Sequence, residues 1–320
     1  MLVLIGAILA QLLHLALVLA AAPLVVGVTR WLKARLMGRR GAPPLQPYRD
    51  LDKLLRKRPV LAENASWVSE LAPYAGVVAP LAAAALVPSF ARGMVLAPVG
   101  DLVVVAGLLA LARMALALAG MDVGTAFGGL GAAREMGFSA FAEPALLLCA
   151  MSFAILAGST NLDAIGAAFV QGALGLRVSL ALAAVAMLAV AVAENARIPV
   201  DNPATHLELT MVHEAMLLES SGRHLALWEY GAALRLTLWF ALLAALFLPY
   251  GTAPAGAGPV AWLLGLVAWA AKMGGLCLAL AVLESAIAKM RVFRVPEFLG
   301  AATLLALLAA ALLFVSTGLA

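Results

Sequence analysis

Eight long apolar stretches follow one another along the chain and constrain its fold more than any other feature. They lie at residues 2–28, 71–90, 101–121, 141–160, 175–195, 232–250, 260–284 and 298–318. A helix needs about 20 apolar residues to cross a bilayer. Only helices and closed barrels satisfy their backbone hydrogen bonds in lipid, and the Ala, Leu and Val content favours helices. The sequence therefore predicts one all-α integral membrane domain over residues 1–320, with about eight transmembrane helices.

Composition excludes a soluble protein and a resident metal site. Hydrophobic residues make up 65% of the chain and charged residues 12%, whereas soluble domains have about 45–50% and about 25%. The two cysteines, Cys149 and Cys277, are too few for a four-thiolate iron–sulfur or zinc site. His206 and His213 would lie about 10.5 Å apart along a helix, too far to share one zinc ion at about 2.0–2.1 Å. We expect no metal or cofactor in this chain.

The basic residues predict the orientation in the membrane. Of the 21 Lys and Arg residues, sixteen lie in the segments after the first, third, fifth and seventh stretches, and only Arg92 and Arg177 lie in the other connections. The positive-inside rule then places the large loops in the cytoplasm and both termini outside. The first stretch is followed, not preceded, by positive charge, so we expect a retained helix in the cytoplasmic membrane. The basic segments lack the interleaved aromatic residues typical of single-strand nucleic-acid binding.

Two of the inner segments have distinct patterns. In the first, residues 48–57 place Leu51, Leu54 and Leu55 on one face of a helix that is otherwise charged, which predicts an amphipathic helix at the membrane surface. This helix would anchor to anionic lipids or form a platform for a soluble partner. The second, residues 122–143, is rich in glycine but lacks a phosphate-binding motif. We expect a loop there, with its glycines serving close packing or backbone flexibility.

The third inner segment, residues 194–230, has the most ionisable groups. A helix is expected at 205–218, and Glu208 and Glu219 would share one face of it if it continued. Histidines and carboxylates at a membrane mouth suit a proton relay, although a solvated surface would have the same composition. Arg113 and Lys272 lie within apolar stretches, where an unpaired charge costs about 2.5–3.5 kcal/mol. Each is interpreted as part of a structural ion pair or of an ion pathway.

Several motifs together resemble one known family. They are GRRG at 38–41, LQP at 45–47, DKLL at 52–55, AEP at 142–144 and AENARIPVD at 193–201. Over nearly its whole length the chain resembles the membrane subunit that joins the peripheral and membrane arms of respiratory complex I and of the energy-converting NiFe hydrogenases. The segments THLELTMVHE (205–214) and AKMRVFRVPEF (288–298) resemble the hydrogenase branch, including formate hydrogenlyase and hydrogenase-4. The run of acids typical of the quinone-reducing branch is interrupted here, with His206 at one acidic position and Glu208 retained.

The resemblance implies a subunit that docks a soluble redox arm and couples electron transfer to proton or sodium movement, with no catalytic centre of its own. Its partners would be an iron–sulfur small subunit, a NiFe large subunit and antiporter-like membrane subunits, with the iron–sulfur clusters and the NiFe centre in those partners. The docking residues would be Arg39, Arg40, Gln46, Leu51, Leu54 and Leu55. The ion-coupling residues would be Arg113, Asp122, Glu143, Glu194, Arg197, Asp201, His206, Glu208, His213, Glu214, Glu219, Glu229 and Lys272.

Two other functions stay open from the sequence. One is the quinone-site subunit of an NADH–quinone oxidoreductase, which predicts quinone reduction by an assembly that contains this chain. The other is a free-standing ion transporter, which predicts ion movement by the chain alone in liposomes. The amphipathic first segment and the long third segment favour docking surfaces over a free-standing transporter.

Overall fold

The structure of the chain is a computed structural model that describes residues 2–172, 177–201 and 211–318. Its helices are α1 (Leu2–Leu36), α2 (Gln46–Leu55), α3 (Trp67–Leu86), α4 (Leu102–Asp122), α5 (Ala126–Ala157), α6 (Leu162–Val170), α7 (Val178–Glu194), α8 (His213–Leu217), α9 (Gly222–Phe247), α10 (Pro259–Ala286) and α11 (Val295–Gly318), with 3-10 turns η1 (Ala97–Val99) and η2 (Val292–Arg294). The described residues form no strand, only isolated bridges. The all-α fold predicted from the sequence is confirmed.

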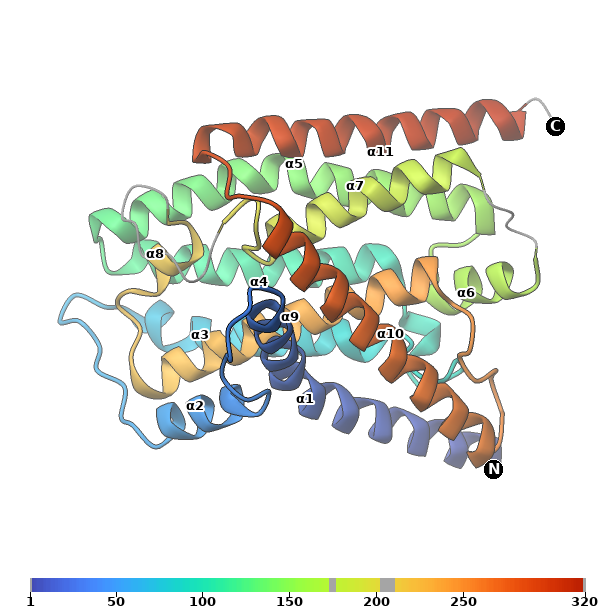
Figure 1. The fold of residues 1–320 in the computed structure, drawn as a ribbon, viewed down its shortest axis with the longest axis horizontal. Coiled ribbons are helices and arrows are strands. Elements are labelled where there is room, and N and C mark those ends of the chain that lie inside the picture. The colour runs from blue at the N-terminus through green and yellow to red at the C-terminus, as the bar shows by residue number, and fades with distance from the viewer. Residues whose placement is uncertain (1, 173–176, 202–210, 319–320) are drawn as a thin grey trace.

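The predicted transmembrane stretches all correspond to helices. Seven described helices are long and apolar enough to cross a membrane: α1, α3, α4, α5, α9, α10 and α11. The remaining predicted stretch, 175–195, corresponds to α7, an apolar helix of 17 residues, which is shorter than a full span. The long helices lie roughly side by side, and α10 crosses the others obliquely (Figure 1).

Helix α9 is the centre of the bundle. Its Leu234, Leu238, Trp239, Leu242 and Leu246 are completely buried, as expected for a helix that is apolar on all sides. It contacts α1, α3 and α2. Helices α4, α5, α11 and α7 form a continuous row, since α4 packs on α5, α5 on α11 and α11 on α7. Arg235, in the central part of α9, is therefore buried inside the protein.

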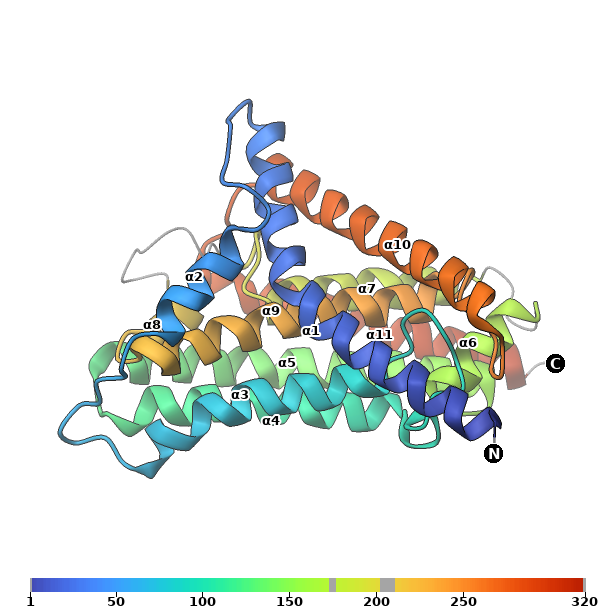
Figure 2. The same cartoon turned by 90° about the horizontal axis from the view of Figure 1, so that it is seen from below.

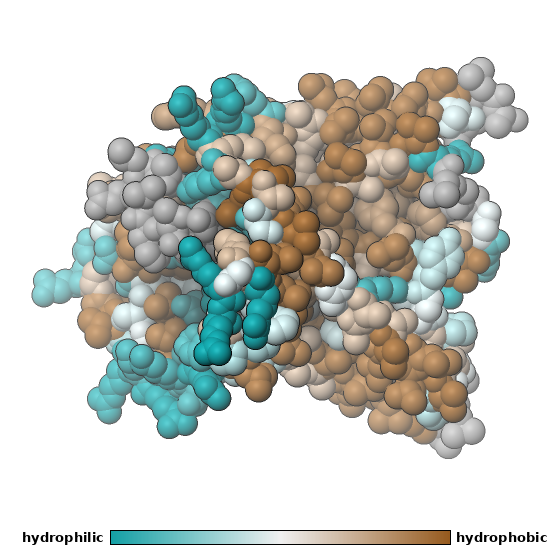
Figure 3. All heavy atoms as spheres, viewed as in Figure 1, coloured by the Kyte–Doolittle hydropathy of each residue, from teal (hydrophilic) through white to brown (hydrophobic). Residues whose placement is uncertain are grey.

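The two ends of the bundle differ in polarity. Residues 37–66, 123–125, 195–201, 211–221 and 287–294 lie at one end of the bundle, which we call the basic end because most Lys and Arg residues lie there. In Figure 3 hydrophilic side chains project mainly from the end where α2 and α8 lie, and apolar side chains cover much of the remaining face. This distribution fits a multi-pass protein whose apolar belt lies in lipid.

One inner loop predicted from the sequence is a helix instead. Helix α5 begins at Ala126, after Thr125, whose side chain accepts a hydrogen bond from the Gly128 amide. A Cβ on Gly128 would overlap the Gly120 carbonyl of α4, and one on Gly131 would lie 2.8 Å from the Val212 carbonyl. Close packing, which was one of the two interpretations, therefore accounts for Gly128 and Gly131. A Cβ on Gly124, Gly129 or Gly137 would meet no atom within 4 Å.

The other two inner segments agree in part with expectation. The amphipathic helix predicted at 48–57 is α2 (Gln46–Leu55), which has no buried residue. Of the helix predicted at 205–218, only residues 211–218 are described, and they contain the short helix α8 (His213–Leu217), after which Glu219 lies in a turn. His206 and Glu208 lie outside the described residues, and no helix continues to bring Glu219 onto a shared face.

Helix α1 changes direction near Pro23 (Figure 2). A proline has no amide hydrogen, so the carbonyl one turn earlier, that of Leu19, loses its usual donor. The hydroxyl of Tyr230 on α9 donates to this carbonyl at 3.0 Å. The hydroxyl of Tyr48 on α2 donates to the next carbonyl, that of Ala20. The bend therefore ties α1 to both α2 and α9.

Candidate functional site

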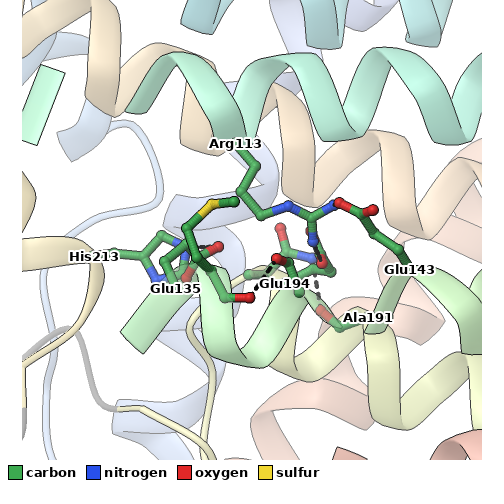
Figure 4. Close-up of polar contacts among 9 residues, drawn as sticks. Arg113, Glu135, Glu143, Ala191, Glu194 and His213 are labelled. Carbon is green, nitrogen blue, oxygen red and sulfur yellow. Dashed lines mark hydrogen bonds and ion pairs between the residues drawn. The ribbon is translucent and has the colours of Figure 1, made fainter. Parts of the chain in front are cut away.

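A buried arginine holds two carboxylates at the core of the membrane region. Arg113 of α4 donates through Nη1 to Glu194 of α7 and through Nη2 to Oε1 of Glu143 of α5, the latter at 2.7 Å. The side chains of Arg113 and Glu194 are only 5% and 6% exposed, whereas that of Glu143 is 47% exposed. Figure 4 shows the guanidinium of Arg113 reaching between the two carboxylates. Arg113 is therefore in ion pairs inside the bundle.

Arg197 follows Glu194 by three residues in the sequence, and the two would be expected to pair, but the structure does not pair them. The cation paired with Glu194 is Arg113. Arg197 lies beyond the end of α7, and its Nη1 is 3.5 Å from Glu284 of α10. Because the chain turns away after α7, nearness in sequence does not place these two side chains together.

Glu135 is a buried carboxylate that the predicted site did not include. It lies on α5, two helical turns before Glu143, and is 4% exposed. The Nε2 atom of His213 on α8 is 3.6 Å from Glu135 Oε1. Extending the apolar stretch of α5 toward its N-terminus would have revealed that Glu135 and Glu143 lie on nearby faces. Because residues 122–143 were expected to form a loop, helical spacing was not applied to Glu135.

Arg235 of α9 is the second functional residue that was missed. It is 8% exposed, and its Nε has no hydrogen-bond partner within the described part of the chain. It lies close enough to Glu194 and Glu135 to act on both carboxylates. The sequence shows Arg235 within an apolar stretch, but the carboxylates near it lie on other helices and cannot be identified from the sequence. We name the set Arg113, Glu135, Glu143, Glu194, His213 and Arg235 the Arg113 cluster.

Burial keeps His213 neutral. Loss of hydration lowers the pKa of His213 from 6.5 to about 3, and the positive charges of Arg235 and Arg113 contribute to this shift while Asp201 opposes it. Neither ring nitrogen has a hydrogen-bond partner among described residues. At neutral pH the imidazole therefore has one nitrogen able to accept a proton and one able to donate.

The Arg113 cluster lies between a cavity and a groove. The cavity, about 190 Å³, is at the basic end, and its ionisable lining residues are Arg30, Asp50, Arg197, His213, Glu214, Glu229 and Arg235. The groove, about 240 Å³, lies between α4 and α5 and is lined by Arg113, Glu143 and Glu194 together with apolar residues such as Ala106 and Leu146. Polar side chains thus connect the cavity with the groove across the apolar bundle.

A second group of charges joins the ends of α1 and α10 to the segment after α7. Lys33 Nζ donates to Glu284 Oε2 at 2.8 Å, and Lys289 Nζ donates to Asp201 Oδ1 at 2.7 Å. With Arg197, which approaches Glu284, these residues form what we call the Glu284 cluster. Asp201, expected in ion coupling, is therefore in an ion pair with Lys289.

The remaining predicted residues have separate positions. Asp122 accepts hydrogen bonds from the amides and hydroxyls of Ser66 and Ser69, so it ties the end of α4 to the start of α3. Glu214 and Glu229 line the cavity, whereas Glu219 is exposed. Lys272 lies on α10, apart from both clusters. No group of His, Cys, Asp and Glu in the described residues is arranged to hold a metal ion.

The predicted docking residues do not form one continuous face. Arg39 and Arg40 are exposed, and Leu55 is 51% exposed. Leu51 instead lines the cavity. Gln46 donates to Asp50 within α2 at 2.8 Å. Leu54 is partly buried. The apolar face of α2 is therefore divided between the cavity and the outer surface.

Comparison with known proteins places this chain among respiratory membrane subunits. A family model described as NADH dehydrogenase matches residues 8–316. Formate hydrogenlyase subunit 4 of Escherichia coli (strain K12) is 34% identical over 281 residues, which cover 87% of this chain and 89% of that protein. Hydrogenase-4 component C of the same organism is 35% identical over 231 residues, 72% of each chain. NADH-quinone oxidoreductase subunit 8 of Rhodothermus marinus is 33% identical over 171 residues, 52% of this chain and 50% of that one.

The fold agrees with this relationship. A chain in the structure of the membrane-bound sulfane sulfur reductase, an archaeal respiratory membrane complex, superposes with a TM-score of 0.80 over 96% of this chain and 99% of that chain, at 22% identity. That likeness shows a shared fold. The family match spans nearly all of the sequence, and two relatives above 30% identity are covered over more than two thirds of their length. The chain therefore belongs to the NADH dehydrogenase subunit 1 family of multi-pass membrane proteins.

Proposed function

We propose that this protein is the membrane anchor and ion-coupling subunit of a hydrogen-evolving NiFe hydrogenase complex of the formate hydrogenlyase type. Its similarity to formate hydrogenlyase subunit 4 and hydrogenase-4 component C supports this branch. The observation that carries the coupling role is the buried polar path of the Arg113 cluster, which links a cavity at the basic end to a groove between α4 and α5.

The composition of the Arg113 cluster suits proton transfer. It has three carboxylates but only two permanent cations, Arg113 and Arg235, because His213 is neutral at pH 7. A buried carboxylate without a compensating cation favours its protonated form. In the proposed relay a proton passes between His213 at the cavity and the carboxylates deeper in the bundle.

The basic end is the proposed docking side. Arg39 and Arg40 are exposed there, beside α2 and the cavity. In the proposed complex the protein lies in a bacterial inner membrane with this end facing the cytoplasm. An iron–sulfur small subunit and a NiFe large subunit bind at this end. Those partners contain the redox centres. Antiporter-like membrane subunits complete the ion path, and anionic lipids contact the surrounding basic residues.

Replacing Glu194 by Gln tests the coupling role. The substitution keeps size and hydrogen-bonding capacity but removes titration. Hydrogenase activity with an artificial dye should stay near normal in the assembled complex, since the dye bypasses the membrane. Activity with the natural donor, or ion movement driven by it, should fall at least tenfold, equivalent to about 1.4 kcal/mol in the barrier.

Glu219→Gln is the matched control, because Glu219 is exposed and lies apart from the path. It should leave both activities unchanged. If the Glu194 variant runs the natural reaction at the wild-type rate with unchanged ion movement, Glu194 is a structural carboxylate. Mass spectrometry of the copurified subunits tests the branch, since the proposal requires a NiFe large subunit.

The cavity gives a specific reason to keep quinone reduction as the second candidate. Its buried His213, Arg197 and Arg235 all have polar atoms without hydrogen-bond partners among described residues, and much of its lining is apolar. Such a site suits a ring with polar substituents and an apolar tail. Reduction of quinone analogues by the purified complex, lost in His213→Leu, would favour this candidate over the hydrogenase.

A further inference from the structure

Lys272 is the only basic residue of α10 and lies at its middle. At 1.5 Å per residue it is about 20 Å from either end of the helix. A lysine near the end of a span extends its ammonium group to the membrane surface along its four-carbon stem. From the middle of α10 that stem covers only part of the distance. The charge of Lys272 therefore lies at a depth where lipid offers no counter-ion.

No group of the described chain compensates this charge. Lys272 has neither a hydrogen bond nor an ion pair with any described residue, whereas Arg113 and Lys33 are both paired with carboxylates. The one carboxylate on α10, Glu284, is three turns away and already contacts Lys33 and Arg197. An ion pair within this chain, which was one of the two sequence interpretations of Lys272, is absent from the described residues.

The side of α10 next to Lys272 is open. The helix buries Gly265, Trp269, Met273, Cys277 and Leu280 against the rest of the bundle. On the other side Ala271, Gly275 and Ala279 are exposed and spaced four residues apart. A Cβ on Gly275 would meet no atom within 4 Å. Small residues at this spacing allow a second helix to approach closely in a membrane.

We infer that this side of α10 contacts a transmembrane helix of a second membrane subunit, and that this helix places an Asp or Glu carboxylate beside Lys272. Charge complementarity selects the occupant. Phospholipid phosphates lie at the surface of a hydrocarbon core about 30 Å thick, so they do not reach a lysine at mid-depth. A carboxylate on a partner helix does. The inference rests on the proposed function only in that the chain assembles with other membrane subunits.

Site-specific cross-linking in the intact wild-type complex tests the surface. A photoreactive residue at Ala271 or Ala279 should form a cross-link to a transmembrane helix of another subunit, with an Asp or Glu within one turn of the cross-linked position. Cross-links to phospholipid alone, or to a helix without an acidic residue, would overturn the inference. This measurement leaves Lys272 itself unchanged, so it does not depend on the folding of a variant.

Substitution tests the charge. Lys272→Met should lower recovery of that partner subunit at least tenfold in mild detergent, whereas Lys272→Arg should keep it within twofold. Leu263→Met, at an exposed position on the opposite side of α10, is the matched control and should recover it fully. Wild-type recovery with Lys272→Met would overturn the role of the charge. Retention of the soluble arm reports separately on the proposed function, because that arm docks at the basic end.

Discussion

The Arg113 cluster and the Glu284 cluster both combine acidic and basic side chains but have opposite charge balance. The Arg113 cluster has three carboxylates, two arginines and a neutral histidine. The Glu284 cluster has two carboxylates, Glu284 and Asp201, and three cations, Lys33, Arg197 and Lys289. A deficit of positive charge favours a bound proton, whereas a surplus keeps carboxylates ionised. The first arrangement suits ion transfer, and the second suits a fixed link between helix ends.

The largest expected effect comes from removing the central cation. Arg113→Met leaves the buried Glu194 without its paired guanidinium. Breaking a buried pair in this way costs about 3–5 kcal/mol. We expect much less folded protein in membranes and a lower unfolding temperature of the purified protein. A variant as stable as the wild type would show that Arg235 alone compensates both buried carboxylates.

The same type of change in the Glu284 cluster should have a smaller effect. Lys33→Met removes one partner of Glu284 but leaves Arg197 at 3.5 Å, and the Lys33 side chain is 22% exposed. We expect a loss of about 1 kcal/mol or less, with ion coupling unchanged. Thermal unfolding and donor-driven ion movement, measured on the same preparation, check both parts. Loss of coupling without loss of stability would remove the distinction between the clusters.

The stability of the protein should decrease in mild acid because of His213. Its folded-state pKa of about 3 lies below the ordinary 6.5, so the unfolded chain binds more protons between these values. Above pH 6.5 His213 is neutral in both states and does not lower the free energy of unfolding. Below pH 6.5 it lowers that free energy by up to about 1.4 kcal/mol per pH unit. Unfolding temperatures at pH 7.5 and 5.5 should differ less for His213→Gln than for the wild type. An equal difference would assign the pH dependence to other groups.

Labelling of introduced cysteines tests which side of the membrane the Glu284 cluster faces and should have the smallest effect on stability. Arg39→Cys and Arg223→Cys are exposed positions at the basic end. In intact cells both should resist a membrane-impermeant thiol reagent, because the positive-inside rule places this end in the cytoplasm. Reaction from outside would place both the Glu284 cluster and the docking surface on the outer side.

The sequence predicts the helices well because each span must be apolar over its own length. The family resemblance also names Glu143, Glu194 and Arg113 as ion-coupling residues, and the structure brings these three side chains together. The sequence does not identify the pairs. Arg235 and Glu135 join the cluster through packing between helices that are distant in sequence, and α5 begins within a segment expected to be a loop. Periodicity within one helix contains no information on which helix lies opposite.

The proline in α1 has a mechanical consequence. Tyr48 of α2 donates to the Ala20 carbonyl and Tyr230 of α9 to the Leu19 carbonyl, so two neighbouring carbonyls before Pro23 join the bend of α1 to two other helices. A displacement of α2 would therefore act on the bend of α1, which Tyr230 in turn joins to the helix that bears Arg235.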